Sequence, residues 1–200
     1  MLNFSFQNTT QIYFGEGQIK ALSKAIPKTA RVLVTYGGGS IKSNGVYDQV
    51  KDALSEHSWF EFSGIEPNPS YDTLMKAQDL IRQHDIDFLL AVGGGSVVDG
   101  TKFIAAAALF EGDDPWDFIA KGAPIKQALP IGCVLTLPAT GSESNVGAVV
   151  TRDGNKLPFH SPLVRPLFAV LDPAVTLSLS KHQISNGVVD AFVHPMEQYL

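Results

Sequence analysis

The tetrapeptide Gly-Gly-Gly-Ser occurs twice in this chain, at residues 37–40 and at residues 93–96. Each copy follows a short apolar run, residues 31–36 in the first case and residues 88–92 in the second. A continuous apolar run that ends in glycine is typical of a strand buried on both faces of a parallel sheet. Because parallel strands all end at the same edge of a sheet, we expect the two glycine-rich loops to lie at one edge.

Strand-like and helical segments alternate along the first half of the chain. Strands are predicted at residues 12–14, 31–36, 59–62 and 88–92, and again later at residues 131–137, 146–151 and 168–171. Helices are predicted over residues 18–26, 46–54, 71–84 and 97–109, and from about residue 184 onward. Ser70 is a suitable N-cap for the third of these helices. The alternation indicates an α/β fold, a parallel sheet with helices on both faces.

The composition is that of a soluble globular protein. The chain is 44% hydrophobic and 18% charged, its net charge is −5, and it contains no run of Lys and Arg. These values argue against a nucleic acid or a membrane as a partner. The single cysteine, Cys133, cannot form an internal disulfide, and no segment resembles a signal peptide or a membrane span. We therefore expect a cytoplasmic protein.

The two glycine-rich loops are candidates for binding phosphate. Glycines at the carboxyl end of a strand let the backbone approach a ligand closely, and the following helix offers free amides to an anion. Such glycines can also serve only to make tight turns, which is the better explanation for a single loop. Two identical tetrapeptides in the same context favour a ligand with two phosphate-bearing ends, a dinucleotide. Neither loop matches the G-x-G-x-x-G pattern.

The last helix carries a possible pair of metal ligands. Asp190 and His194 are four residues apart and therefore lie on one face of a helix, one turn from each other. They can bind one divalent metal together, although two ligands are only half of a tight site. The alternative is a simple side-chain pair without metal. None of the other histidines has a spacing that completes a tetrahedral site with this pair; they are His57, His84, His160 and His182.

Three separated motifs carry a resemblance to a known family. They are residues 93–99 (Gly-Gly-Gly-Ser-Val-Val-Asp), residues 137–143 (Leu-Pro-Ala-Thr-Gly-Ser-Glu) and residues 190–194 (Asp-Ala-Phe-Val-His). In this order they resemble the iron-containing, or group III, alcohol dehydrogenases, in particular the branch of NADPH-dependent aldehyde reductases and butanol dehydrogenases. The resemblance implies a Rossmann-like, dehydroquinate synthase-like dinucleotide-binding domain at residues 1–181. Residues 182–200 would then begin an all-helical domain that binds the metal.

The resemblance also implies which residues bind the cofactor. The second loop would hold the pyrophosphate, and the first would receive the adenosine ribose. The residues so assigned are Gly37, Gly38, Gly39, Ser40, Gly94, Gly95, Ser96, Asp99, Thr136, Thr140, Ser142 and Lys156. Members that prefer NAD carry an aspartate where this chain has Gly39, so we expect NADP(H) as the cofactor. Lys42 could add a positive charge beside the 2′-phosphate.

The family's metal, Fe2+ or Zn2+, is bound by one aspartate and three histidines. Asp190 and His194 match two of these ligands, and the resemblance implies that the other two histidines lie beyond Leu200. The expected reaction is hydride transfer between NADP(H) and a small aldehyde or alcohol, with the metal polarising the aldehyde oxygen. We expect a homodimer in the full-length form.

Other functions remain open at this point. Polyol and glycerol-type dehydrogenases share the fold. Glycerol-1-phosphate dehydrogenase and dehydroquinate synthase share it as well, but they need more basic residues than this chain offers near the cleft. A dinucleotide-binding module without catalytic activity is the alternative outside the enzymes.

Overall fold

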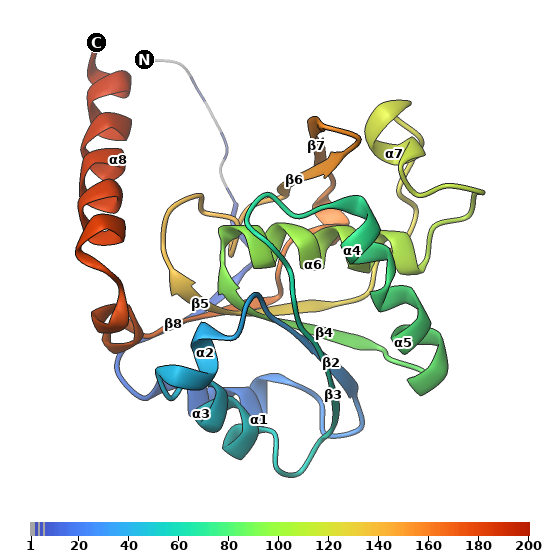
Figure 1. Cartoon of the computed structure of the whole chain (residues 1–200), viewed down its shortest axis with the longest axis horizontal. Helices are drawn as coiled ribbons and strands as arrows, with labels where there is room; N and C mark the ends of the chain where they lie inside the picture. The colour runs from blue at the N-terminus through green and yellow to red at the C-terminus, as the bar shows by residue number, and fades with distance from the viewer. Residues whose placement is uncertain (1–2, 4, 6) are drawn as a thin grey trace.

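The computed structural model describes residues 3, 5 and 7–200, and its centre is a six-stranded sheet in which all neighbouring strands are parallel. The strand order is β1-β8-β5-β4-β2-β3 (Figure 1). The strands are β1 (Gln11–Phe14), β2 (Arg31–Thr35), β3 (Ser58–Phe62), β4 (Phe88–Gly94), β5 (Ile131–Leu137) and β8 (Phe168–Leu171). The four inner strands are almost entirely buried, which explains why their sequences are continuous apolar runs.

Helices cover both faces of the sheet, as the sequence predicts (Figure 1). One face carries the 3-10 helix η1 (Gln18–Ala21), α1 (Leu22–Ala25), α2 (Ser40–Ser43) and α3 (Val46–Ala53). The opposite face carries α4 (Tyr71–Met75), α5 (Ala77–His84), α6 (Gly95–Ala108) and α7 (Asp117–Ala120). Side chains alternate along each strand between these two cores: Val32 and Val34 pack on the first face, and Leu33 packs on the second.

A small hairpin lies outside the main sheet. Its strands are β6 (Gly147–Arg152) and β7 (Asn155–His160), and they pair antiparallel around Asp153 and Gly154. Both turn residues have positive φ, 50° and 77°, as two-residue hairpins favour. The buried side chains of Ala148, Val150 and Phe159 join the core around α6. The sequence predicts the first strand and the turn, but the second strand, β7, was not predicted.

Two predicted helices differ from the structure in detail. Ser70 is the N-cap of α4, as expected, and its hydroxyl accepts a hydrogen bond from the Thr73 amide. The segment then divides at Lys76 into α4 and α5, because the Lys76 amide bonds to the carbonyl of Thr73 three residues back rather than continuing the α-helical pattern. The first predicted helix likewise begins as the 3-10 turn η1 before α1.

Helix α8 (Lys181–Tyr199) follows two 3-10 turns, η2 (Pro162–Val164) and η3 (Pro173–Ser178). It starts at a capping box in which Ser180 and Gln183 exchange side-chain and backbone hydrogen bonds. The helix passes through Pro195 and ends four residues later. It has no buried residue and stands beside the sheet (Figure 1, red). Among the described residues, no helix is both long and apolar enough to cross a bilayer.

The two-sided core predicts a large difference between two leucine substitutions. Leu90 on β4 is 0% exposed, whereas Leu167, just before β8, is 55% exposed. We expect Leu90→Ala to lower the free energy of unfolding by about 2–5 kcal/mol because it leaves a cavity. Leu167→Ala should change it by less than about 1 kcal/mol. Urea unfolding followed by circular dichroism measures both, and equal losses would contradict the assigned burial.

Candidate functional site

A cleft of about 400 Å³ lies where the inner strands end. The ends of β2, β4 and β5 and the loops that follow them form its base. Seven of the residues assigned to cofactor binding line it: Gly37, Gly38, Ser40, Gly94, Gly95, Ser96 and Thr136. The structure thus brings both glycine-rich loops to one edge of the sheet, the position at which open α/β sheets bind ligands.

The first glycine-rich loop leaves its backbone accessible. Gly39 is the N-cap of α2 and has φ +98°, a conformation that favours glycine. A Cβ atom on Gly38 would meet no atom within 4 Å, so this residue presents open backbone beside the cleft. Gly37 is more enclosed, since its Cβ would lie 3.0 Å from the carbonyl oxygen of Ile65.

The second loop is tightly packed. A Cβ atom on Gly93 would lie 2.6 Å from Cγ2 of Val97, and one on Gly95 would lie 2.7 Å from Oγ1 of Thr140. Helix α6 begins at Gly95 without a side-chain cap and without an acidic residue in its first turn. Its first amides therefore have no helical partner and carry the partial positive charge of a helix N-terminus at the cleft.

Asp99, Thr140 and Ser142 lie behind the cleft rather than on its lining. The Asp99 carboxylate accepts hydrogen bonds from the Ser142 hydroxyl at 2.6 Å and from the Val149 amide at 3.0 Å. The Thr140 hydroxyl accepts a bond from the Ser142 amide at 3.3 Å. In this arrangement Asp99 connects α6 to the segment after β5 and to the hairpin.

Lys156 on β7 also lies outside the lining. Its ammonium group donates to Oδ1 of Asn68 at 2.7 Å, in the loop between β3 and α4. In the same loop, the carbonyl oxygen of Pro69 accepts a hydrogen bond from the Thr151 amide at 2.9 Å. These contacts bring the β6–β7 hairpin against a loop whose Pro67 lines the cleft.

Lys42 is engaged in a cluster next to the first loop. Its ammonium group lies 3.4 Å from Oε2 of Glu61 and over the rings of Tyr36 and Tyr47, 5.2 and 4.7 Å from their centroids. Both tyrosine hydroxyls donate to the Glu61 carboxylate at 2.5 Å. Partial burial opposes ionisation of Glu61, but these hydrogen bonds outweigh it and hold the pKa of Glu61 below its usual value. The positive charge expected from Lys42 is therefore paired with a carboxylate.

Several cleft residues were not expected from the sequence. They come from the end of α2, the β3–α4 loop, the start of α6, the end of β5 and the segment around the start of α8: Ser43, Asn44, Ile65, Pro67, Val97, Leu137, Ser178, Leu179 and Gln183. The Asn44 side-chain amide donates to the Ser178 hydroxyl at 3.2 Å and so joins two of these segments. The sequence Pro67-Asn68-Pro69 is typical of a loop, but nothing in the local sequence around residues 178–183 indicates a site.

Lys102 on α6 was also not expected from the sequence, and its side chain is 0% exposed. Its ammonium group donates to Ser142 Oγ at 2.9 Å, Asn145 Oδ1 at 2.9 Å and the carbonyl oxygens of Gly147 and Asn145 at 2.8 and 3.1 Å. Burial lowers its pKa to about 8. A lysine inside a predicted helix is expected to be solvated, so no sequence signal distinguishes this buried lysine from an exposed one.

Asp190 and His194 lie on α8 as the four-residue spacing requires. Oδ2 of Asp190 and Nε2 of His194 are 3.7 Å apart, and both side chains are more than half exposed. A carboxylate and an imidazole are donors that suit Fe2+ or Zn2+. Within the described part of the chain, no cluster of three or more His, Cys, Asp or Glu residues could hold a metal. The pair therefore fits part of a metal coordination sphere.

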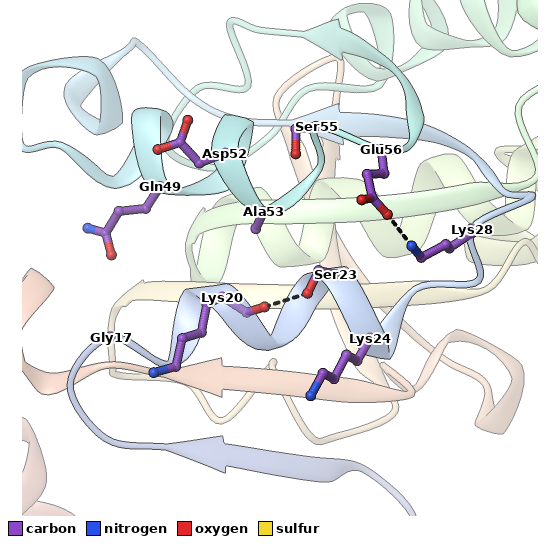
Figure 2. Close-up of a pocket in the computed structure, with 10 residues that line it drawn as sticks. All are labelled: Gly17, Lys20, Ser23, Lys24, Lys28, Gln49, Asp52, Ala53, Ser55 and Glu56. Atoms are coloured by element: carbon purple, nitrogen blue, oxygen red, sulfur yellow. Dashed lines mark hydrogen bonds and ion pairs between the residues drawn. The ribbon is translucent and has the colours of Figure 1, made fainter.

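A larger groove of about 610 Å³ lies elsewhere, between α3 and the η1–α1 segment (Figure 2). Lys20, Lys24 and Lys28 line it together with Asp52 and Glu56, and Lys28 pairs with Glu56. None of the residues assigned to cofactor or metal binding lines it. Its charges are exposed and of both signs, so we place the functional site at the cleft beside the glycine-rich loops.

Comparison with known proteins gives consistent relatives. The family model described as iron-containing alcohol dehydrogenase matches residues 9–173. NADPH-dependent aldehyde reductase YqhD of Escherichia coli is 59% identical over 100% of this chain and 53% of its own length. NADP-dependent alcohol dehydrogenase 3 of Entamoeba histolytica is 46% identical over 100% of this chain and 54% of its own length.

Solved structures agree with these relatives. The crystal structure of E. coli YqhD superposes with a TM-score of 0.93 at 60% identity, over 98% of this chain and 51% of that one. NADH-dependent butanol dehydrogenase A of Thermotoga maritima gives a TM-score of 0.90 at 44% identity, over 98% of this chain and 50% of that one. The chain thus spans about half the length of its relatives. It belongs to the iron-containing alcohol dehydrogenase family.

Proposed function

We propose that this chain is the cofactor-binding part of a metal-dependent oxidoreductase that transfers hydride between NADP(H) and a small aldehyde or alcohol. The observation that carries the proposal is the single cleft that unites both glycine-rich loops at the ends of β2 and β4. The free amides at the start of α6 suit the pyrophosphate, and the open backbone at Gly38 suits the adenosine end. When bound, the nicotinamide supplies the hydride.

The proposed preference for NADPH rests on the first loop. A carboxylate at Gly39 would repel a 2′-phosphate, and this chain has no carboxylate there. The named relatives include both NADPH- and NADH-dependent enzymes, so family membership alone does not decide the preference. Because Lys42 is paired with Glu61, the open backbone of Gly38 and the Ser40 hydroxyl are the groups left to receive the phosphate.

The proposed role of Asp190 and His194 is to bind Fe2+ or Zn2+. Their carboxylate and imidazole lie on one face of α8, and further ligands must come from outside the described residues. We assign residues 1–181 to the dinucleotide-binding domain and residues 182–200 to the first helix of an all-helical metal-binding domain. We also place the enzyme in the cytoplasm as a homodimer, without nucleic acid or membrane partners.

Two alternatives are distinguished by the same assay. A polyol or glycerol-type dehydrogenase would oxidise glycerol or a sugar alcohol faster than it reduces a short aldehyde. A dinucleotide-binding module would bind NADPH without turning over either class. NADPH consumption with a panel of short-chain aldehydes, and NADP+ reduction with the corresponding alcohols and polyols, assigns the complete gene product to one of the three.

The cofactor preference predicts the effect of a charge at residue 39. Gly39→Asp should weaken NADPH binding by about tenfold or more relative to Gly39→Asn, because only the aspartate repels the 2′-phosphate. The two variants share the strain of a side chain at φ +98°, so their difference isolates the charge. Dissociation constants for NADPH and NADH follow from the cofactor's fluorescence. Equal NADPH affinities of the two variants would refute the assigned position of the phosphate.

The metal proposal predicts which function is lost on chelation. In the complete gene product, removing divalent metal should abolish aldehyde reduction and leave NADPH binding intact, and Fe2+ or Zn2+ should restore activity. Asp190→Asn and His194→Gln should each lower metal affinity, measured by metal content after dialysis. Glu197→Gln on the same helix is the matched control, with unchanged metal content. Full activity in a metal-free preparation would overturn the role of this pair.

A further inference from the structure

Lys102 holds a buried position that the proposed chemistry does not use. Its side chain is 0% exposed, and its ammonium group has four oxygen acceptors within 3.1 Å. All four belong to residues 142–147, the segment between β5 and β6 that has no helix or strand until Gly147. An ammonium group has three donor hydrogens, so at least two of these four oxygens share one hydrogen.

The removal of this cation would leave the segment without its support. Ser142 Oγ and the carbonyl oxygens of Asn145 and Gly147 would then lose the Lys102 donor, and Asn145 Oδ1 would keep only the Gly147 amide at 3.0 Å. Buried acceptors without partners are costly, and hydrogen bonds to charged groups are stronger than neutral ones. We therefore expect the Lys102 ammonium group, with three donors and a positive charge, to hold residues 142–147 more firmly than the neutral amine, which has two donors.

The support reaches the cleft through Asn145. The Oδ1 atom of Asn145 accepts from Lys102, and its side-chain amide donates to the carbonyl oxygen of Thr140 at 3.3 Å. The Thr140 hydroxyl in turn lies against Gly95, where a Cβ atom would be 2.7 Å from Oγ1. Gly95 lines the cleft and begins α6, the helix that also carries Lys102.

Asp99 completes the arrangement from the same helix. It lies three residues before Lys102, and its two carboxylate oxygens accept from the Ser142 hydroxyl and the Val149 amide. Ser142 therefore accepts from Lys102 and donates to Asp99. The two charged side chains of α6 hold both ends of one segment, with a neutral hydroxyl between them.

We propose that Lys102 is a positioning residue for the cofactor cleft, and that its buried ammonium group fixes residues 142–147 on α6 and thereby sets Thr140 beside Gly95. The expected effect on cofactor affinity rests on the proposed function. The structural part of the inference, the order of the segment, is independent of any cofactor. The two parts can therefore be tested separately.

The first test measures the segment itself by hydrogen exchange in the 200-residue chain at one pH. Lys102→Met leaves an unbranched side chain that is one atom shorter, and it removes the charge. We expect faster exchange at the amides of Ser142, Gly147 and Val149, with slow exchange retained at the inner strand β4. Lys126→Met is the control, because Lys126 pairs with Glu111 on the exposed surface. Unchanged exchange at these three amides in Lys102→Met overturns the proposal.

The second test measures NADPH affinity by cofactor fluorescence. Lys102→Met should raise the dissociation constant by about tenfold or more, the equivalent of one charged hydrogen bond, while Lys126→Met binds as the wild type does. Faster exchange together with unchanged NADPH affinity would refute the link from the segment to the cleft. If the wild-type chain binds no NADPH, the proposed function fails and the exchange experiment alone decides the structural part.

The pH dependence of the wild-type chain provides a further readout. The titratable or charged groups near Lys102 are Asp99 on its own helix, Glu143 in the segment, Cys133 on β5 and Arg165 after η2. Because burial lowers its pKa from 10.5 to about 8, the folded chain loses this proton while the unfolded chain keeps it. This group alone therefore raises the free energy of unfolding between those pH values.

NADPH affinity should change in the opposite direction. Because the ammonium group orders the cleft in this proposal, the affinity of the wild-type chain for NADPH should fall as the pH rises through about 8. Deprotonation of Lys102 does not lower the free energy of unfolding over the same range. Lys102→Met should bind weakly on both sides of this pH without the decline. The same decline in wild type and Lys102→Met would contradict the assignment to Lys102.

Discussion

The close packing of α6 on the end of β4 is the constraint on which both the core and the cleft depend. A side chain at Gly93 would collide with Val97, and a Cβ atom at Gly100 would lie 2.8 Å from Leu74. Without side chains at these positions, α6 lies directly against the sheet and against α4 (Figure 1). Ten of its residues are buried. One helix therefore holds the sheet, the hairpin and the second glycine-rich loop in a fixed arrangement.

Much of this architecture could be predicted because its signals are local. The inner strands are buried on both faces, so their sequences are continuous apolar runs, and the glycines after them mark where each strand ends. The residues of both loops consequently lie around one cleft. The α/β fold and the family resemblance are confirmed by the structure and the comparisons.

The remaining site residues depend on contacts between distant parts of the chain. Asp99 follows a glycine-rich loop, yet its carboxylate bonds to Ser142 and Val149 behind the cleft. Lys102 has the sequence context of a solvated helix residue, but the segment after β5 encloses it. Ser178 reaches the cleft through the turn before α8. No periodicity or spacing within a short window contains such information, because tertiary packing decides where each side chain points.

Helix α8 has a thermodynamic consequence of its own. Its 19 residues include none that is buried, so within this chain its helicity rests on its capping box and on contacts between successive turns. Isolated helices of this kind exist in equilibrium with coil, since nucleation is costly and each added residue contributes little. The 3.7 Å approach of Asp190 and His194 belongs to the helical population alone. A metal ion that binds both side chains would therefore select that population, and its apparent affinity would include the free energy of helix formation.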